Sequence, residues 1–190
     1  MKYDVILSGV GGQGVLSIAA IITQAAVMKG LEVRQSEVHG MAQRGGAVIA
    51  HLRLADNAIA SDLVPRGAAD LILSMEPLES LRYTSWLSPD GALVSSADPL
   101  VNIPNYPELD GILDAIKRFP LYRIVEAASL AKQAGHVRSV NMVMVGAASA
   151  FLPIAVEALE EAIKETFANK DAGALEANIK AFNLGRNAAK

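Results

Sequence analysis

A glycine-rich turn near the start of the chain is the first pattern that could carry chemistry. Gly9-Val10-Gly11-Gly12-Gln13-Gly14 has the spacing G-x-G-x-x-G and separates a β-rich segment from an Ala/Ile-rich one. In such a turn Gly9 permits the tight bend, Gly11 lets the backbone approach a ligand, and Gly14 lets the helix pack on the sheet. The N–H groups that begin the helix favour an anion. We therefore predict a candidate anion or phosphate site at Gly9, Gly11, Gly12, Gln13 and Gly14.

The ligand of this turn stays open among three alternatives. A dinucleotide site needs an acidic residue at the end of the second strand, about 20 residues further on. Glu37 lies at a suitable distance but leads into a polar loop, so it meets this need only in part. The turn could instead serve packing or face a partner chain. It could also bind a phosphate-bearing ligand such as coenzyme A.

The densest polar group of the chain follows at residues 37–46, with the sequence EVHGMAQRGG. Glu37 and His39 are candidates for an acid/base pair. Arg44 could clamp a carboxylate or a phosphate. We predict these three as weak catalytic candidates. We also predict a loop that faces a partner or the active site, made of His39, Gly40, Met41, Gln43, Arg44, Gly45 and Gly46.

Other polar residues give weaker signals. The chain has three histidines, and their spacing predicts no metal site. We expect His51 to be a half-buried or exposed strand residue. Glu76 follows a strand, which favours an exposed or capping role, and Asn141 is expected to cap a helix.

The positions of these motifs depend on alternating strands and helices. Apolar runs predict strands over residues 3–8, 31–39, 47–54, 70–75, 92–96 and 122–125, and helical segments follow most of them. A turn is expected at residues 88–91, and Pro153 is expected to begin a helix. This order predicts an α/β fold: a single Rossmann-like domain over residues 1–190, with a mostly parallel sheet and a helical C-terminal layer from about residue 141 to 190.

Composition excludes several classes of protein. Apolar residues make up 52% and charged residues 19%, which indicates either a surface covered by another chain or an Ala-rich protein. The net charge of −3 gives no basic footprint for nucleic acid. The chain has no cysteine, which excludes disulfides and a self-held iron–sulfur cluster. Glycines interrupt the uncharged run after Val5, so we predict neither a signal peptide nor a membrane span, and a cytoplasmic location.

Several motifs together resemble a known family. They are GVGGQGV at residues 9–15, SEVHGMAQRGG at 36–46, GAAD at 67–70, MEPLE at 75–79 and NMVMVG at 141–146. This set is similar to the gamma-type subunit of 2-oxoacid (pyruvate/ketoisovalerate type):ferredoxin oxidoreductases. The resemblance covers residues 1 to about 163. The form VHGMAQRGG looks most like the beta subunit of the indolepyruvate type.

The resemblance implies a division of labour between two chains. A large partner subunit would hold thiamine diphosphate, Mg²⁺ and the 4Fe–4S clusters. The complex would oxidatively decarboxylate an aryl pyruvate, transfer the acyl group to coenzyme A and pass electrons to ferredoxin. The isolated chain would then be inactive. Two alternatives remain: a free-standing NAD(P)-dependent dehydrogenase with Glu37 on the ribose, and a module that senses an anionic metabolite.

Overall fold

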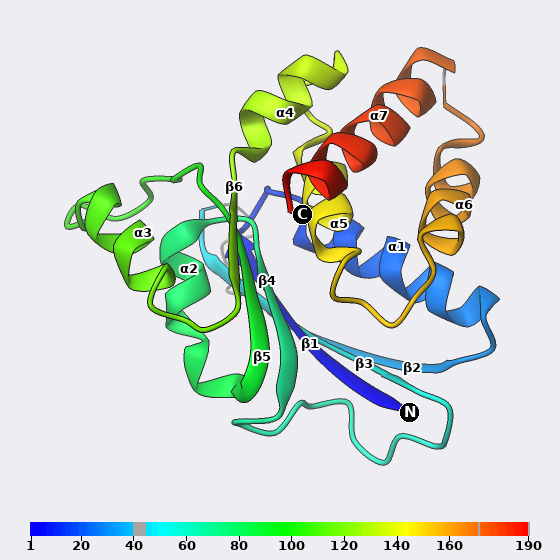
Figure 1. Cartoon of the computed structure of the whole chain (residues 1–190), viewed down its shortest axis with the longest axis horizontal. Coiled ribbons are helices and arrows are strands. Elements are labelled where there is room, and N and C mark those ends of the chain that lie inside the picture. Colours follow the sequence, from blue (N-terminus) through cyan, green and yellow to red (C-terminus); the bar gives the residue numbers. More distant parts are fainter. Residues whose placement is uncertain (40–44, 171, 190) are drawn as a thin grey trace.

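A six-stranded sheet forms the centre of the computed structural model, which describes residues 1–39, 45–170 and 172–189 (Figure 1). The spatial order of its strands is β2 (Glu32–His39), β3 (Ala47–Ala55), β1 (Lys2–Val10), β4 (Ala69–Ser74), β5 (Leu87–Ser96) and β6 (Tyr122–Val125). Among these strands only β3 runs antiparallel to its neighbours. It forms a hairpin with β2 and pairs with β1 along its whole length. The prediction of a mostly parallel sheet is confirmed.

Helices cover both faces of the sheet (Figure 1). One face carries α1 (Val15–Met28), α4 (Ala127–Ala134), α5 (Val140–Ala148), α6 (Val156–Phe167) and α7 (Ala172–Ala188). The other face carries α2 (Pro77–Arg82), a short 3₁₀ helix (η1, Thr84–Trp86) and α3 (Leu109–Ile116). Cover on both faces explains why β1 and β4 are continuous apolar runs rather than alternating ones.

Helix α1 buries more than one side, as its apolar circumference predicts. Its buried residues pack against the sheet and against helices α5 and α6. Three large apolar side chains nevertheless face solvent, since Leu16 is 42%, Val27 58% and Met28 41% exposed. The part of this helix that the fold leaves uncovered is therefore apolar.

Helices α5 and α7 approach one another very closely at two glycines. A Cβ atom on Gly146 would lie 1.9 Å from the carbonyl oxygen of Phe182. A Cβ atom on Gly185 would lie 1.9 Å from the carbonyl oxygen of Val143. The predicted C-terminal helical layer is thus held by backbone contact that only glycine permits.

Three expected element boundaries are wrong. Strand β5 begins at Leu87, so the predicted turn at residues 88–91 lies within it, where the pairing with β4 is irregular between Ala69 and Leu71. Helix α5 starts at Val140 with Ser139 as its N-cap residue, so Asn141 lies inside the helix and does not cap it. Helix α6 begins at Val156 and not at Pro153. In the described part of the chain, no helix has the length and apolar character needed to cross a bilayer.

Candidate functional site

The glycine turn joins β1 to α1 through two left-handed residues. Gly12 has φ +102° and Gly14 has φ +86°, values that side chains with a Cβ rarely adopt. Gln13 braces the turn, because its side-chain oxygen accepts the Val10 N–H at 2.7 Å. Its amide nitrogen donates to the carbonyl of Met75 at 3.2 Å, and Met75 directly follows β4, the strand next to β1. The side chain of Gln13 therefore stabilises the turn through hydrogen bonds to the ends of both strands.

The roles predicted for the first and third glycines are wrong in detail. Gly9 is the packing position, since a Cβ there would lie 2.9 Å from Val15 and 3.0 Å from Met75. Gly14 provides the left-handed N-cap of α1 instead. Its position leaves the helix N-terminus open, because no side chain among the described residues caps it.

Both backbone hydrogen-bonding groups of Gly11 have partners within the chain, and its predicted contact with a ligand stays a prediction. Its N–H donates to the Gly46 carbonyl at 2.8 Å, and its carbonyl accepts the Gly45 N–H at 3.2 Å. These bonds join the glycine turn to Gly45 and Gly46, which we call the second glycine-rich loop. Within the described part of the chain, the N–H groups of Gly12 and Gly14 have no hydrogen-bond acceptor. An anion at this turn would therefore meet Gly12, Gly14 and the first turn of α1.

A pocket of about 430 Å³ opens beside the turn, outside the carboxyl ends of β1, β4 and β5. We call it the switch-point pocket, because the chain leaves β1 toward β2 on one side and continues from β4 to β5 and β6 on the other. Such a crevice is where open α/β sheets bind ligands. Its lining includes Gly12, Gln13, Gly14, Met75, Ser96, Asp98, Leu100, Arg138 and Asn141.

Asp98 and Arg138 are the charged side chains in this lining. Asp98 is already engaged, because one carboxylate oxygen accepts the Ser96 hydroxyl at 2.9 Å and the Ala128 N–H at 2.8 Å. No partner of the Arg138 guanidinium is found among residues 1–39, 45–170 and 172–189. The pocket can therefore offer an anion one cation, together with the N–H groups of the turn.

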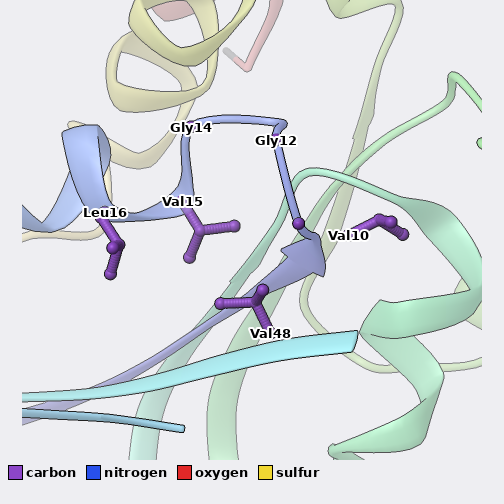
Figure 2. A pocket seen from close by; sticks show the side chains of 7 residues that line it. Val10, Gly12, Gly14, Val15, Leu16 and Val48 are labelled. Carbon is purple, nitrogen blue, oxygen red and sulfur yellow. The ribbon is translucent and has the colours of Figure 1, made fainter. Parts of the chain in front are cut away.

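The other side of the turn is different in character. Figure 2 shows Val10, Val15, Leu16 and Val48 around a second cavity of about 430 Å³, bounded by the backbone of the turn. We call it the apolar pocket, since every side chain in its lining is a valine or a leucine. It suits an apolar side chain rather than a charged ligand.

A buried carboxylate lies at the end of β4, behind the switch-point pocket. Glu76 is 1% exposed, and its oxygens accept the Glu79 N–H at 2.8 Å, the Leu100 N–H at 3.3 Å and the Tyr106 hydroxyl. Burial, together with this hydrogen bond, raises the pKa of Tyr106 well above its ordinary value. Burial also raises the pKa of Glu79, although Arg82 beside it acts in the opposite direction. The expected capping role of Glu76 is confirmed, but the residue is not exposed.

The structure separates Glu37 from the glycine turn. Glu37 lies on β2, and β3 stands between β2 and β1, so two strand spacings separate Glu37 from the strand that ends in the turn. In a dinucleotide fold the acidic strand is the direct neighbour of β1. The backbone of His39 pairs with Val48, and Gly45 and Gly46 contact Gly11. Gly40, Met41, Gln43 and Arg44 lie outside the described residues, and the catalytic roles stay predictions.

His51 is buried, at 6% exposure, and the expectation of a half-buried or exposed residue is wrong. Its Nδ1 accepts the Val64 N–H at 3.1 Å, and its ring meets Trp86 edge-on at 6.2 Å. Burial, with the positive charge of Arg53 nearby, holds the pKa of His51 below its ordinary value. This histidine anchors the segment after β3 and lies away from the switch-point pocket.

Comparison with known proteins identifies the family. The family described as "Pyruvate ferredoxin/flavodoxin oxidoreductase" matches residues 4–188. The chain belongs to this family. The resemblance predicted from the glycine turn and the VHGMAQRGG motif is thereby confirmed, as is the class of protein, an oxidoreductase subunit.

Relatives of this family match the whole chain. "Indolepyruvate oxidoreductase subunit IorB" of Archaeoglobus fulgidus is 36% identical, with 100% of this chain and 96% of the relative covered. The protein of the same name from Pyrococcus horikoshii is 37% identical, with the same coverage. "2-oxoglutarate synthase subunit KorC" of Methanothermobacter thermautotrophicus is 29% identical, with 98% and 94% covered.

Solved structures of the family have the same fold. The 2-oxoglutarate:ferredoxin oxidoreductase from Magnetococcus marinus superposes with a TM-score of 0.77 at 22% identity, over 99% of this chain and 31% of that longer one. The keto/oxoacid ferredoxin oxidoreductase gamma subunit from Geobacter sulfurreducens PCA gives 0.71 at 24% identity, over 98% of both chains. At these identities the likeness extends to the fold, and it confirms the predicted α/β class.

Proposed function

We propose that this chain is the small subunit of a complex that oxidatively decarboxylates aryl pyruvates, with indolepyruvate as the representative substrate. One observation carries the proposal. Four relatives at 36–37% identity over the whole chain are named for indolepyruvate, whereas relatives named for 2-oxoglutarate or for pyruvate and ketoisovalerate reach 27–30%. The substrate of the first group is therefore the best guide to this chain.

The reaction needs groups that this chain is not built to hold. The bond between the oxo carbon and the carboxylate breaks to release CO₂. The thiol of coenzyme A loses its proton as its sulfur bonds to the acyl carbon, and two electrons pass to ferredoxin. Thiamine diphosphate with Mg²⁺ and the 4Fe–4S clusters belong, in this proposal, to the large partner subunit in the cytoplasm. The absence of cysteine from the chain supports this division for the clusters.

This chain would contribute a wall of the site where coenzyme A enters. The N–H groups of Gly12 and Gly14 and the guanidinium of Arg138 border the switch-point pocket, which suits a phosphate-bearing ligand. The second glycine-rich loop, tied to Gly11 through Gly45 and Gly46, would lie against the partner.

The test is reconstitution of the chain with its large subunit. We expect ferredoxin reduction with indolepyruvate and coenzyme A only when both subunits are present, and lower kcat/KM with pyruvate and 2-oxoglutarate. An Arg138→Gln variant should raise the KM for coenzyme A while leaving the KM for indolepyruvate unchanged. Ferredoxin reduction by the isolated chain, or a preference for 2-oxoglutarate, would overturn the proposal.

A further inference from the structure

A buried carboxylate without a cation needs an explanation. Glu76 is 1% exposed, and no ion pair to it is found among the residues that the structure describes. Burying an isolated carboxylate is costly unless hydrogen bonds replace its water. Here three donors do so: the N–H groups of Glu79 and Leu100 and the hydroxyl of Tyr106. Glu79 belongs to the cap of α2, but Leu100 and Tyr106 lie 24 and 30 residues further along the chain.

Both distant donors belong to residues 97–108, a segment with neither helix nor strand. It contains three prolines, which have no N–H group to donate. Glu76 accepts hydrogen bonds from this segment at two residues, Leu100 and Tyr106. Leu100 is also part of the lining of the switch-point pocket. The carboxylate therefore fixes one wall of that pocket from behind.

Between these two points the segment reaches the second glycine-rich loop. The side-chain amide of Asn102 donates to the Gly45 carbonyl at 2.9 Å. The N–H of Gly45 in turn donates to Gly11 in the glycine turn, at 3.2 Å. A continuous path thus leads from Glu76 through the segment to both glycine-rich loops.

The base of this path is rigid. The Ser74 hydroxyl donates to the Glu76 carbonyl at 2.7 Å and accepts the Ser8 hydroxyl at 2.8 Å, which ties β4 to β1. Both serines are fully buried. An anion on such a base can hold several donors at once, whereas a neutral amide has one acceptor oxygen and would leave a donor unpaired.

We propose that Glu76 is a positioning residue, which acts through Tyr106 and Leu100 to fix the segment whose Asp98, Pro99 and Leu100 line the switch-point pocket and, through Asn102, to hold Gly45 in place. Its effect on turnover rests on the proposed function, because the pocket and the loop are the parts assigned there to coenzyme A and to the partner. Its effect on the loops does not.

The first experiment is amide hydrogen exchange on the full chain with Tyr106→Phe, which removes only the hydroxyl. We expect about tenfold faster exchange at Leu100 and Gly45, in line with loss of a hydrogen bond to a charged group, and no change at Ile72 in the core. Tyr122→Phe, on β6, is the matched control. Asn102→Ala should accelerate hydrogen exchange at the amide of Gly45 but not at the amide of Leu100.

The second experiment uses the reconstituted complex. Tyr106→Phe and Glu76→Gln should raise the KM for coenzyme A about tenfold with kcat nearly unchanged, and Tyr122→Phe should change neither. Unaltered exchange at Leu100 and Gly45 in Tyr106→Phe, or equal acceleration at Ile72, would overturn the positioning role. If instead exchange changes as expected while the wild-type complex turns over no aryl pyruvate, the proposed function fails and the positioning role stands.

Discussion

Gly11 illustrates how a single residue can look like a ligand contact and serve another purpose. The G-x-G-x-x-G spacing assigns it to close approach of a ligand. In the structure both of its backbone hydrogen-bonding groups bind the second glycine-rich loop. Among the described residues of the turn, the N–H groups of Gly12 and Gly14 have no acceptor, although the spacing gives Gly12 no role and assigns Gly14 to helix packing. The residue that joins the two loops is therefore the one that the motif would assign to the ligand.

His51 gives a pH dependence of stability at the residue scale. Its pKa is lowered in the folded chain, so the unfolded chain binds the proton more readily. The free energy of unfolding should therefore fall as the pH drops below about 6.5, the ordinary pKa of histidine, by at most about 1.4 kcal/mol per pH unit for one group. Urea unfolding at pH 7.5 and 5.5 would measure it, and His51→Gln should lose this part of the decrease.

Arg53 carries a second prediction at this scale. Its guanidinium meets the buried carboxylate of Asp4 at 2.8 and 3.2 Å and also donates to the Ser61 and Leu63 carbonyls. Arg53→Ala should cost about 2–4 kcal/mol of unfolding free energy, because it removes two charge-assisted hydrogen bonds from the buried carboxylate, which keeps only its pair with the half-exposed Lys2 ammonium, 2.9 Å away, among the described ion pairs.

The matched control for Arg53 is Arg34→Ala, whose pair with Glu32 is exposed at 50% and 34%. It should cost less than about 1 kcal/mol. Equal losses in the two variants would contradict the assignment of the Asp4 pair as an internal anchor.

At the scale of elements, the crossing of α5 and α7 is the contact most sensitive to substitution. A methyl group at Gly146 or Gly185 would collide with backbone oxygen at 1.9 Å, which no side-chain rearrangement can relieve. We expect Gly146→Ala and Gly185→Ala each to lower the free energy of unfolding by at least about 2 kcal/mol.

Gly111 in α3 provides the control for the same chemical change. A Cβ there meets no atom within 4 Å. Gly111→Ala should therefore stabilise the chain by about 0.5–1 kcal/mol, through the better helix propensity of alanine. Thermal or urea unfolding of the three variants would separate the effect of close packing from that of propensity.

At the scale of the whole molecule, the glycine turn has two unlike sides. The switch-point pocket is bordered by the charged side chains of Asp98 and Arg138, whereas the apolar pocket on the side of α1 and β3 ends at the exposed Leu16. This asymmetry suits a subunit that meets a ligand on one side and a protein on the other.

Leu16→Glu tests that arrangement through assembly. A carboxylate at the lip of the apolar pocket should weaken binding of the proposed large subunit at least about tenfold, since it would bury a charge at the contact. The folded chain should keep its stability, because an acidic residue near the N-terminus of a helix is favourable. Val27→Glu, at the far end of α1 and 58% exposed, is the control and should bind the large subunit normally. Sedimentation or calorimetry of the mixed subunits would measure both, and equal binding by the two variants would contradict the arrangement.

Local pattern was sufficient for much of this protein. Local residue patterns predicted each of the six strands in the described sheet. The apolar runs of β1 and β4 reflect burial on both faces, whereas β2 (EVRQSEVH) mixes polar and apolar residues. The G-x-G-x-x-G spacing placed the turn between β1 and α1, since only glycine adopts the φ values found at Gly12 and Gly14. Together with the VHGMAQRGG motif it identified the family, and the lack of cysteine excluded a self-held cluster.

Contacts between distant residues decided the remainder. The position of β3 between β1 and β2 moved Glu37 away from the turn, and strand order is set by packing of the whole sheet rather than by any local pattern. The sequence predicted Glu76 as a helix cap because its contact with α2 is the local one. Its other two hydrogen-bond donors, Leu100 and Tyr106, are distant in the sequence. Neighbouring residues in the sequence therefore determine the glycine turn and the family. The pocket beside the turn forms only in the folded chain, where separate strands end at one edge of the sheet.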